Sequence, residues 1–112
     1  MEIHLIDPPR EFSVGNMGAT LFQTADIRLD PQEQVTFMRV SGAEYDVVAK
    51  SWGYYATPSI NGRLETFGFR VALARGRHHG KRFILLLERG YESDFESYLE
   101  AEDLEVETWI TA

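Results

Sequence analysis

The side chains best suited to binding gather in the middle of the chain, over residues 52–70. Trp and Tyr offer flat apolar faces with polar edges, and an Arg guanidinium makes two parallel hydrogen bonds to a carboxylate or a phosphate. This combination is typical of a site for a sugar, a nucleotide or an acidic metabolite. The candidate binding residues are Trp52, Tyr54, Tyr55, Asn61, Arg63 and Arg70.

The same stretch is equally compatible with two further roles. The aromatic residues could fill the core while Gly53, Pro58 and the Asn61-Gly62 pair shape a loop, because Asn-Gly is a favoured type I′ hairpin turn. Aromatic residues beside Arg also mark the hot spots of protein–protein interfaces. Residue types alone do not separate a ligand site, a protein interface and a packed loop.

Arg70 is the member of this group whose surroundings the sequence predicts best. Residues 66–75 alternate cleanly, with large apolar side chains on one face of a strand. Gly68 and Ala72 flank Arg70 on the other face and are too small to shield it. We therefore expect Arg70 to project from a shallow patch and to bind an anion or an acidic partner through its planar guanidinium. Alternatively, Arg70 pairs with Glu88 or with an acid of the following helix.

Motifs of catalysis and of metal binding are mostly absent. His78 and His79 are adjacent, so they would point to opposite sides of a strand, and no second ligand pair has metal-site spacing. Ser51 or Ser59 could be combined with a His into a triad, but any chain of this length offers such combinations. The sequence therefore predicts no metal and no cofactor, and it leaves open whether the chain is an enzyme.

Length and composition predict a single domain, residues 1–112, that is large enough to bury a core. The chain has no Cys, which excludes a disulfide framework. No apolar run approaches the roughly 20 residues that span a bilayer, and the first residues lack the basic flank of a signal peptide. We expect a cytoplasmic protein with no membrane partner.

The charge distribution is uneven along the chain. The net charge of −7 argues against general nucleic-acid binding, which needs Lys and Arg to neutralise phosphates. Seven of the eleven basic residues lie within residues 63–89, and eight of the eighteen acidic residues lie within residues 92–107. Such blocks predict either two solvated faces or a local basic site on an acidic protein.

Residues 1–34 are predicted to form an irregular N-terminal arm. Residues 1–6 and 20–23 could each form a short strand, but Asp7-Pro8-Pro9 interrupts any regular element between them. The apolar residues between positions 10 and 30 follow neither the period of a strand nor that of a helix. This part of the chain is therefore expected to lie outside the regular core.

Residues 35–112 are predicted to form that core. Helical spacing of the apolar residues predicts a helix over residues 91–103. Residues 82–89 are apolar on both faces, which is typical of a central, doubly covered strand. One helix can cover only one sheet face, so the fold class is α+β, a mostly antiparallel sheet of about five strands with one amphipathic helix on one face. The predicted strands are 35–40, 43–50, 67–75, 82–89 and 104–111.

A longer motif carries a resemblance. The run from Trp52 to Leu64, followed by Phe67-Gly68-Phe69-Arg70, resembles small, functionally uncharacterised bacterial proteins associated with surface-polysaccharide loci, beside enzymes that aminate or assemble unusual sugars. The resemblance covers about residues 35–110 and leaves the arm uncovered. It implies a bacterial protein in the context of polysaccharide biosynthesis, and it supplies no catalytic residues.

Two functions are compatible with these observations. The first is a non-catalytic accessory module that binds a protein, either an enzyme of glycan biosynthesis or a second copy of the chain. A homodimer could form through the strand at residues 105–110, because an uncovered edge strand invites pairing. The alternative is a small enzyme or ligand-binding protein that acts on a sugar or nucleotide-sugar at the aromatic and Arg residues.

Overall fold

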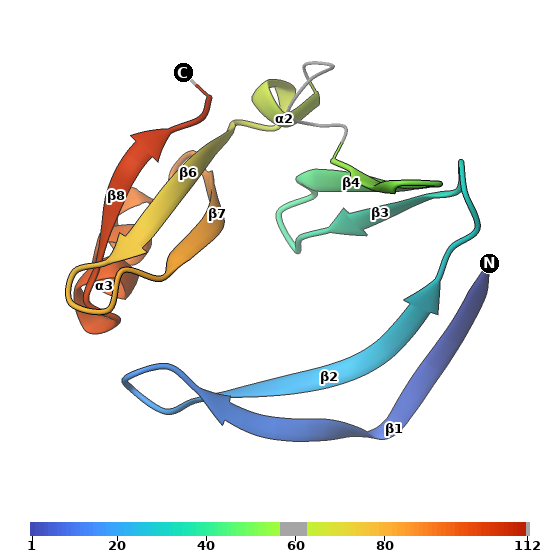
Figure 1. Ribbon diagram of the computed structural model, residues 1–112, viewed down its shortest axis with the longest axis horizontal. Helices are drawn as coiled ribbons and strands as arrows, with labels where there is room; N and C mark the ends of the chain where they lie inside the picture. Colours follow the sequence, from blue (N-terminus) through green and yellow to red (C-terminus); the bar gives the residue numbers. More distant parts are fainter. Residues whose placement is uncertain (57–62, 112) are drawn as a thin grey trace.

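The computed structural model describes residues 1–56 and 63–111. In that part of the chain, eight strands form three small antiparallel sheets, and two helices connect or cover them (Figure 1). The predicted fold class, α+β with mostly antiparallel sheet, is confirmed. The predicted number of elements, about five strands in one sheet and one helix, was too low because the two N-terminal strands, the short strand Gly53–Tyr55 and the short helix Arg63–Thr66 were not predicted.

The first sheet is a long hairpin of β1 (Glu2–Val14) and β2 (Ala19–Arg28), which we call the arm. The expectation of an irregular arm is therefore corrected. The register shifts between Leu5 and Arg10, where Pro8 and Pro9 supply no backbone N–H. This irregularity changes the phase of the alternation along β1, so no single strand period extends over residues 2–14.

The second sheet has the strand order β3 (Gln34–Met38), β4 (Glu44–Lys50), β5 (Gly53–Tyr55). Val35 pairs with Val47 and Phe37 pairs with Tyr45, so one face is apolar as predicted. The opposite face carries the buried Asp46, whose carboxylate accepts a 2.6 Å hydrogen bond from the Thr36 hydroxyl.

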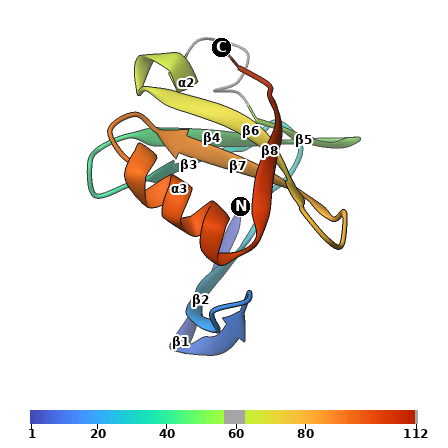
Figure 2. The ribbon, with the colours of Figure 1, turned by 90° about the vertical axis from the view of Figure 1, so that its left-hand side faces the viewer.

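The third sheet places β6 (Phe69–Gly76) between β7 (Arg82–Glu88) and β8 (Leu104–Trp109). The predicted helix is confirmed as α3 (Glu92–Ala101), which lies across the outer side of this sheet (Figure 2). β8 is an edge strand of this sheet, as predicted. β7 is not the central strand but the other edge, and both of its faces are apolar because one contacts α3 and the other contacts the core.

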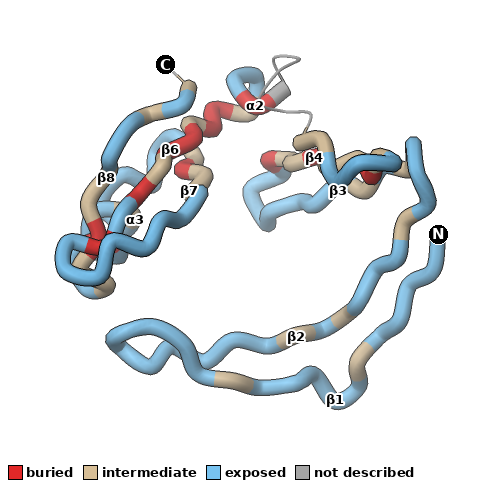
Figure 3. The backbone as a smooth tube through the Cα atoms, in the orientation of Figure 1, coloured by how far each residue is buried: buried red, intermediate tan, exposed pale blue. Residues whose placement is uncertain are grey.

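The core lies between the second and third sheets, beside the short helix α2 (Arg63–Thr66). Leu64 of α2 is 2% exposed and is among the most deeply buried side chains described. The arm contributes no buried residue, as the exposed surface along its length shows (Figure 3). The buried members of the core cluster are Ala43, Leu64, Phe69 and Val71, and Tyr45, Phe67 and Leu86 pack against them.

The buried carboxylate of the second sheet yields a stability prediction. Asp46→Ala removes the acceptor of the Thr36 hydroxyl inside a nearly solvent-free site, so the free energy of unfolding should fall by about 1–3 kcal/mol. Glu11→Ala changes an exposed acid on a strand and should stay within about 0.5 kcal/mol of wild type. Urea unfolding followed by circular dichroism measures both, and equal effects of the two variants would contradict this role of Asp46.

Candidate protein-binding surface

One face of the arm is apolar along most of its length. Because residues paired across an antiparallel hairpin share a face, the register identifies its members. Leu5 and Ile3 are 73% and 56% exposed, and Leu21 is 45% exposed. We call this surface the arm face; its pairs are Ile3 with Ile27, Leu5 with Ala25, Arg10 with Gln23, Phe12 with Leu21, and Val14 with Ala19.

The arm face meets the apolar face of the second sheet where β2 ends. There the two surfaces enclose an open hollow of about 300 Å³. Phe37 and Tyr54 remain 51% and 72% exposed within it, so the hollow is wide and unfilled. Its lining residues are Ile27, Leu29, Val35, Phe37, Val47 and Tyr54.

The third sheet carries a further exposed apolar side chain beside the core. Ile84 pairs with Leu73 and lies on the same side of β7 as Leu86, which packs against the core. Ile84 is nevertheless 58% exposed, because the core ends before it. The arm runs from the second sheet towards the third sheet (Figure 1). We call the set Ile3, Leu5, Leu21, Ile27, Phe37, Tyr54 and Ile84 the open apolar surface.

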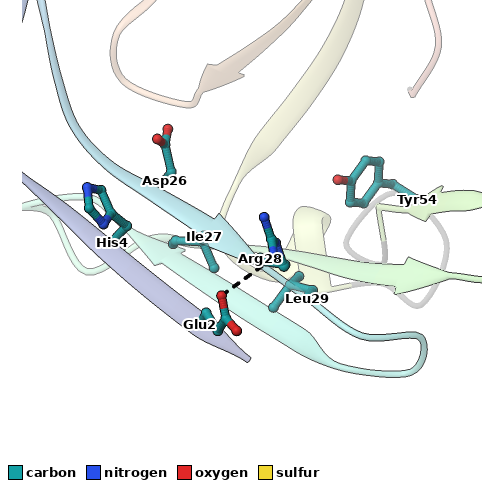
Figure 4. A pocket seen from close by; sticks show the side chains of 7 residues that line it. All are labelled: Glu2, His4, Asp26, Ile27, Arg28, Leu29 and Tyr54. Atoms are coloured by element: carbon teal, nitrogen blue, oxygen red, sulfur yellow. Dashed lines mark ion pairs between the residues drawn. The ribbon is translucent and has the colours of Figure 1, made fainter.

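A polar hollow of about 490 Å³ adjoins this surface (Figure 4). His4 pairs with Asp26 across the arm, and Glu2 forms a 3.7 Å ion pair with Arg28. Tyr54 lies on the opposite wall and belongs to both hollows. Within residues 1–56 and 63–111, no group of three or more His, Cys, Asp or Glu side chains could hold a metal ion.

A single carboxylate holds the tip of the arm. Glu102, at the end of α3, accepts hydrogen bonds of 3.0 Å from the Asn16 amide and 3.4 Å from the Met17 amide. Gly15 has φ +78°, and a Cβ at this position would overlap the Glu102 carboxylate. The tip is therefore shaped to receive that side chain.

The structure separates the candidate residues that were predicted to act together. Tyr54 faces the hollows, whereas Tyr55 pairs with Val48 on the other face of the second sheet and is half-buried. Trp52 is 72% exposed in the turn between β4 and β5. The remaining predicted positions, Asn61 and the side chain of Arg63, lie outside what the structure describes.

Arg70 does not project from an open patch. Its guanidinium lies 3.8 Å from the centre of the Trp109 ring, which itself contacts Phe95 of α3. Ala72, its neighbour on the same face, is fully buried. The small residues beside Arg70 thus make room for the helix layer, and the cation is stacked on an aromatic face.

The basic and acidic blocks of the sequence neutralise each other across the third sheet. Arg75 reaches Glu105 at 2.7 Å, and Arg82 donates two hydrogen bonds of 3.0 Å to Glu107. Near the turn after β6, the His78 ring contacts Asp103. Of the two alternatives, a local basic site therefore does not apply to these arginines, because the strand order β7-β6-β8 brings the two blocks together.

Comparison of the chain with protein-family models, with curated proteins and with solved structures finds no significant match in any of the three. No helix in the described ranges is long and apolar enough to cross a membrane.

The arm face is the exposed apolar surface that the sequence patterns did not predict. Its signal was present as alternation at Ile3 and Leu5, and again at Phe12 and Val14. The two segments are out of phase across the prolines, so a single period does not join them. Only the pairing with β2 aligns them on one face.

The Arg82–Glu107 pair predicts a pH dependence of stability. The hydrogen bonds from Arg82 hold the pKa of Glu107 below its ordinary value. A carboxyl whose pKa is lower in the folded chain stabilises the fold at neutral pH and loses that contribution as pH falls through the folded pKa. Glu107→Gln should therefore lower the unfolding free energy near about pH 7, with a difference from wild type that shrinks towards about pH 3.

Urea unfolding at a series of pH values measures this difference. Glu96→Gln, a neutralisation on the exposed side of α3, is the matched control and should stay within about 0.5 kcal/mol of wild type. A gap between wild type and Glu107→Gln that stayed constant with pH would rule out the ion pair as its source.

The contact at the tip of the arm predicts a local loss of protection. Glu102→Ala removes the charged acceptor of the Asn16 and Met17 amides, so their hydrogen exchange should accelerate at least about tenfold. Glu100→Ala, an exposed acid on the same helix, should leave both amides unchanged. NMR-detected exchange resolves the two positions, and equal rates in wild type and Glu102→Ala would show that the tip is not held by this carboxylate.

Proposed function

We propose that the chain is a non-catalytic accessory module that binds a protein through the open apolar surface. The observation that carries the proposal is the exposure of large apolar side chains on one face of each of the three sheets, among them Leu5, Phe37, Tyr54 and Ile84. Monomeric proteins rarely leave a contiguous apolar patch of more than a few hundred Å² in water. A surface of this kind is typical of a protein interface.

The dimensions of the chain support the same proposal. A compact chain of 12.8 kDa is expected to expose about 6,300 Å², whereas this one exposes 8014 Å². Its radius of gyration is 15.5 Å, against about 13 Å for a compact domain of this length. The excess surface belongs in part to the arm, which contains no buried residue.

The resemblance of residues 52–70 to proteins of surface-polysaccharide loci supports one class of partner. Enzymes that make or assemble unusual bacterial sugars are the first candidates for the protein that binds here. This assignment rests on the resemblance alone, whereas the proposal of a protein interface rests on the exposed apolar faces.

A sugar or nucleotide-sugar site is the second candidate function, and one observation favours it. Tyr54 stands over the polar hollow with Glu2, His4, Asp26 and Arg28, where an aromatic face and hydrogen-bonding groups could hold a sugar. Arg70 would take no part, since it is stacked on Trp109. Calorimetric titration with nucleotide-sugars, with wild type and Tyr54→Ala, tests this alternative.

The proposed interface predicts a difference between two neighbouring residues of β3. Phe37 and Met38 are 51% and 74% exposed and lie on opposite faces of the second sheet. Phe37→Glu places a charge in the interface and should weaken complex formation at least about tenfold, whereas Met38→Glu adds the same charge outside it. Light scattering of wild type and of both variants, each alone and mixed with the enzymes of its locus, detects any complex.

Two outcomes would count against the interface. The first is that wild type is monomeric by itself and forms no complex with any enzyme tested. The second is that Phe37→Glu and Met38→Glu form the complex equally well. Circular dichroism of both variants confirms that the comparison is made between folded proteins.

A further inference from the structure

We infer that two copies of the chain form a two-fold dimer, in which the arm of each copy lies with its arm face against the open apolar surface of the other. This inference rests on the proposed function of protein binding, and it names a second copy of the chain, in place of a biosynthetic enzyme, as the protein that covers the surface. It assigns dimerisation to the arm instead of to the edge strand β8.

The arm needs a packing partner to be stable. A two-stranded hairpin is marginal in water by itself, and the arm face leaves Leu5, Ile3 and Leu21 largely exposed. Within its own chain the arm is held near its ends, by Glu102 at the tip and by the 3.1 Å ion pair between the Met1 amino group and Glu33 at the open end. Its middle portion contains no buried residue, so a surface from elsewhere must exclude water from it.

The excess exposed area of the chain is large enough to form the interface of an obligate dimer. Each chain exposes about 1,700 Å² more than a compact monomer of its mass. If both copies bury this excess, the interface totals about 3,400 Å², within the range of about 2,000–5,000 Å² found for obligate homodimers.

The two surfaces that must meet are present on the same chain. The arm offers a protruding apolar face, and Phe37 and Ile84 lie on the apolar faces of the sheets that would receive it. A two-fold axis uses each surface twice, once from each copy, which closes the assembly without leaving an apolar face open. A second copy therefore satisfies both surfaces at once.

The charges allow the arm to enter the other copy. Although each chain carries −7, Arg10 is the one ionised residue among the paired residues of the arm face, and it donates a 2.7 Å hydrogen bond to Gln23 on the same face. Asp7 lies in the unpaired segment between Leu5 and Arg10, and the register assigns it to neither face. The acids Glu2, Glu11 and Asp26 lie on the opposite face of the hairpin. Two acidic chains can thus meet through the paired residues of the arm face without bringing these three carboxylates together.

The edge of β8 is less suited to self-association. Its Glu105 and Glu107 are already paired with Arg75 and Arg82 of the same sheet. Pairing two β8 edges would bring these glutamates close to those of the other copy, and like charges directly opposite each other destabilise a strand pair.

The test uses two adjacent residues of β2. Leu21 lies on the arm face and Phe22 on the opposite face, and they are 45% and 58% exposed. Wild type should sediment as a dimer, with twice the mass of 12.8 kDa. Because the two-fold axis repeats each change, Leu21→Glu should raise the dimer dissociation constant at least about 100-fold, and Phe22→Glu should leave it within about threefold.

Sedimentation velocity over a dilution series measures the three dissociation constants, and circular dichroism checks folding. If Leu21→Glu does not fold, Ile84→Glu probes the receiving surface from the third sheet, with the same expected loss. The inference is supported when the arm-face or receiving-surface variant dissociates and Phe22→Glu does not.

Three results would overturn the inference. One is a wild-type monomer at about 100 µM, and another is equal dimerisation by Leu21→Glu and Phe22→Glu. The third is a monomer with a radius of gyration near about 13 Å by X-ray scattering, in which the arm has closed on its own chain. A monomer that still forms a Phe37-dependent complex with an enzyme leaves the proposed function standing, whereas a monomer that forms no complex ends both.

Discussion

The exclusion of water from one apolar face on each of three sheets is the constraint on which the structure depends. The second and third sheets meet this constraint together, with Leu64, Phe69 and Val71 buried between them. Each buried side chain of this kind stabilises a fold by about 1.5–3 kcal/mol. The arm face has no such partner within the chain, and this imbalance accounts for both the exposed surface and the extended shape.

Electrostatic pairing supports the arrangement without creating it. Arg75, Arg82, Glu105 and Glu107 form a network across the three strands of the third sheet. These ion pairs are solvent-exposed, so each contributes little to stability. Their larger effect is on the surface that remains, because they neutralise basic residues that would otherwise offer a site for an anion.

The arm behaves as a separate structural element with a defined anchor. The Glu102 carboxylate holds backbone amides of the tip, and Gly15 leaves the space for it. A charge-assisted contact of this kind sets the direction of the arm but excludes little water from its apolar side chains. Glu102 therefore fixes the orientation of the arm, whereas burial of its apolar side chains depends on a different surface.

The sequence by itself determined the elements that have one period throughout. Strand alternation and helical spacing are local properties, so the strands of residues 35–50 and 67–75, the last strand and the helix α3 could be predicted. The strand of residues 82–89 could be predicted from its short apolar run. The arm could not, because the prolines shift the phase of β1 and only its pairing with β2 restores a common face. The fold class was within reach of the sequence, but the division into three sheets was not.

Only the tertiary structure decided which predicted site residues lie together. Tyr54 and Tyr55 are adjacent, yet the pleat of β5 sends them to opposite faces. Arg70 was correctly expected to lie on the face opposite Phe69, but the presence of Trp109 beside it depends on a strand about forty residues later. Contacts between distant residues follow from sheet order and helix placement, and local sequence patterns carry no record of either.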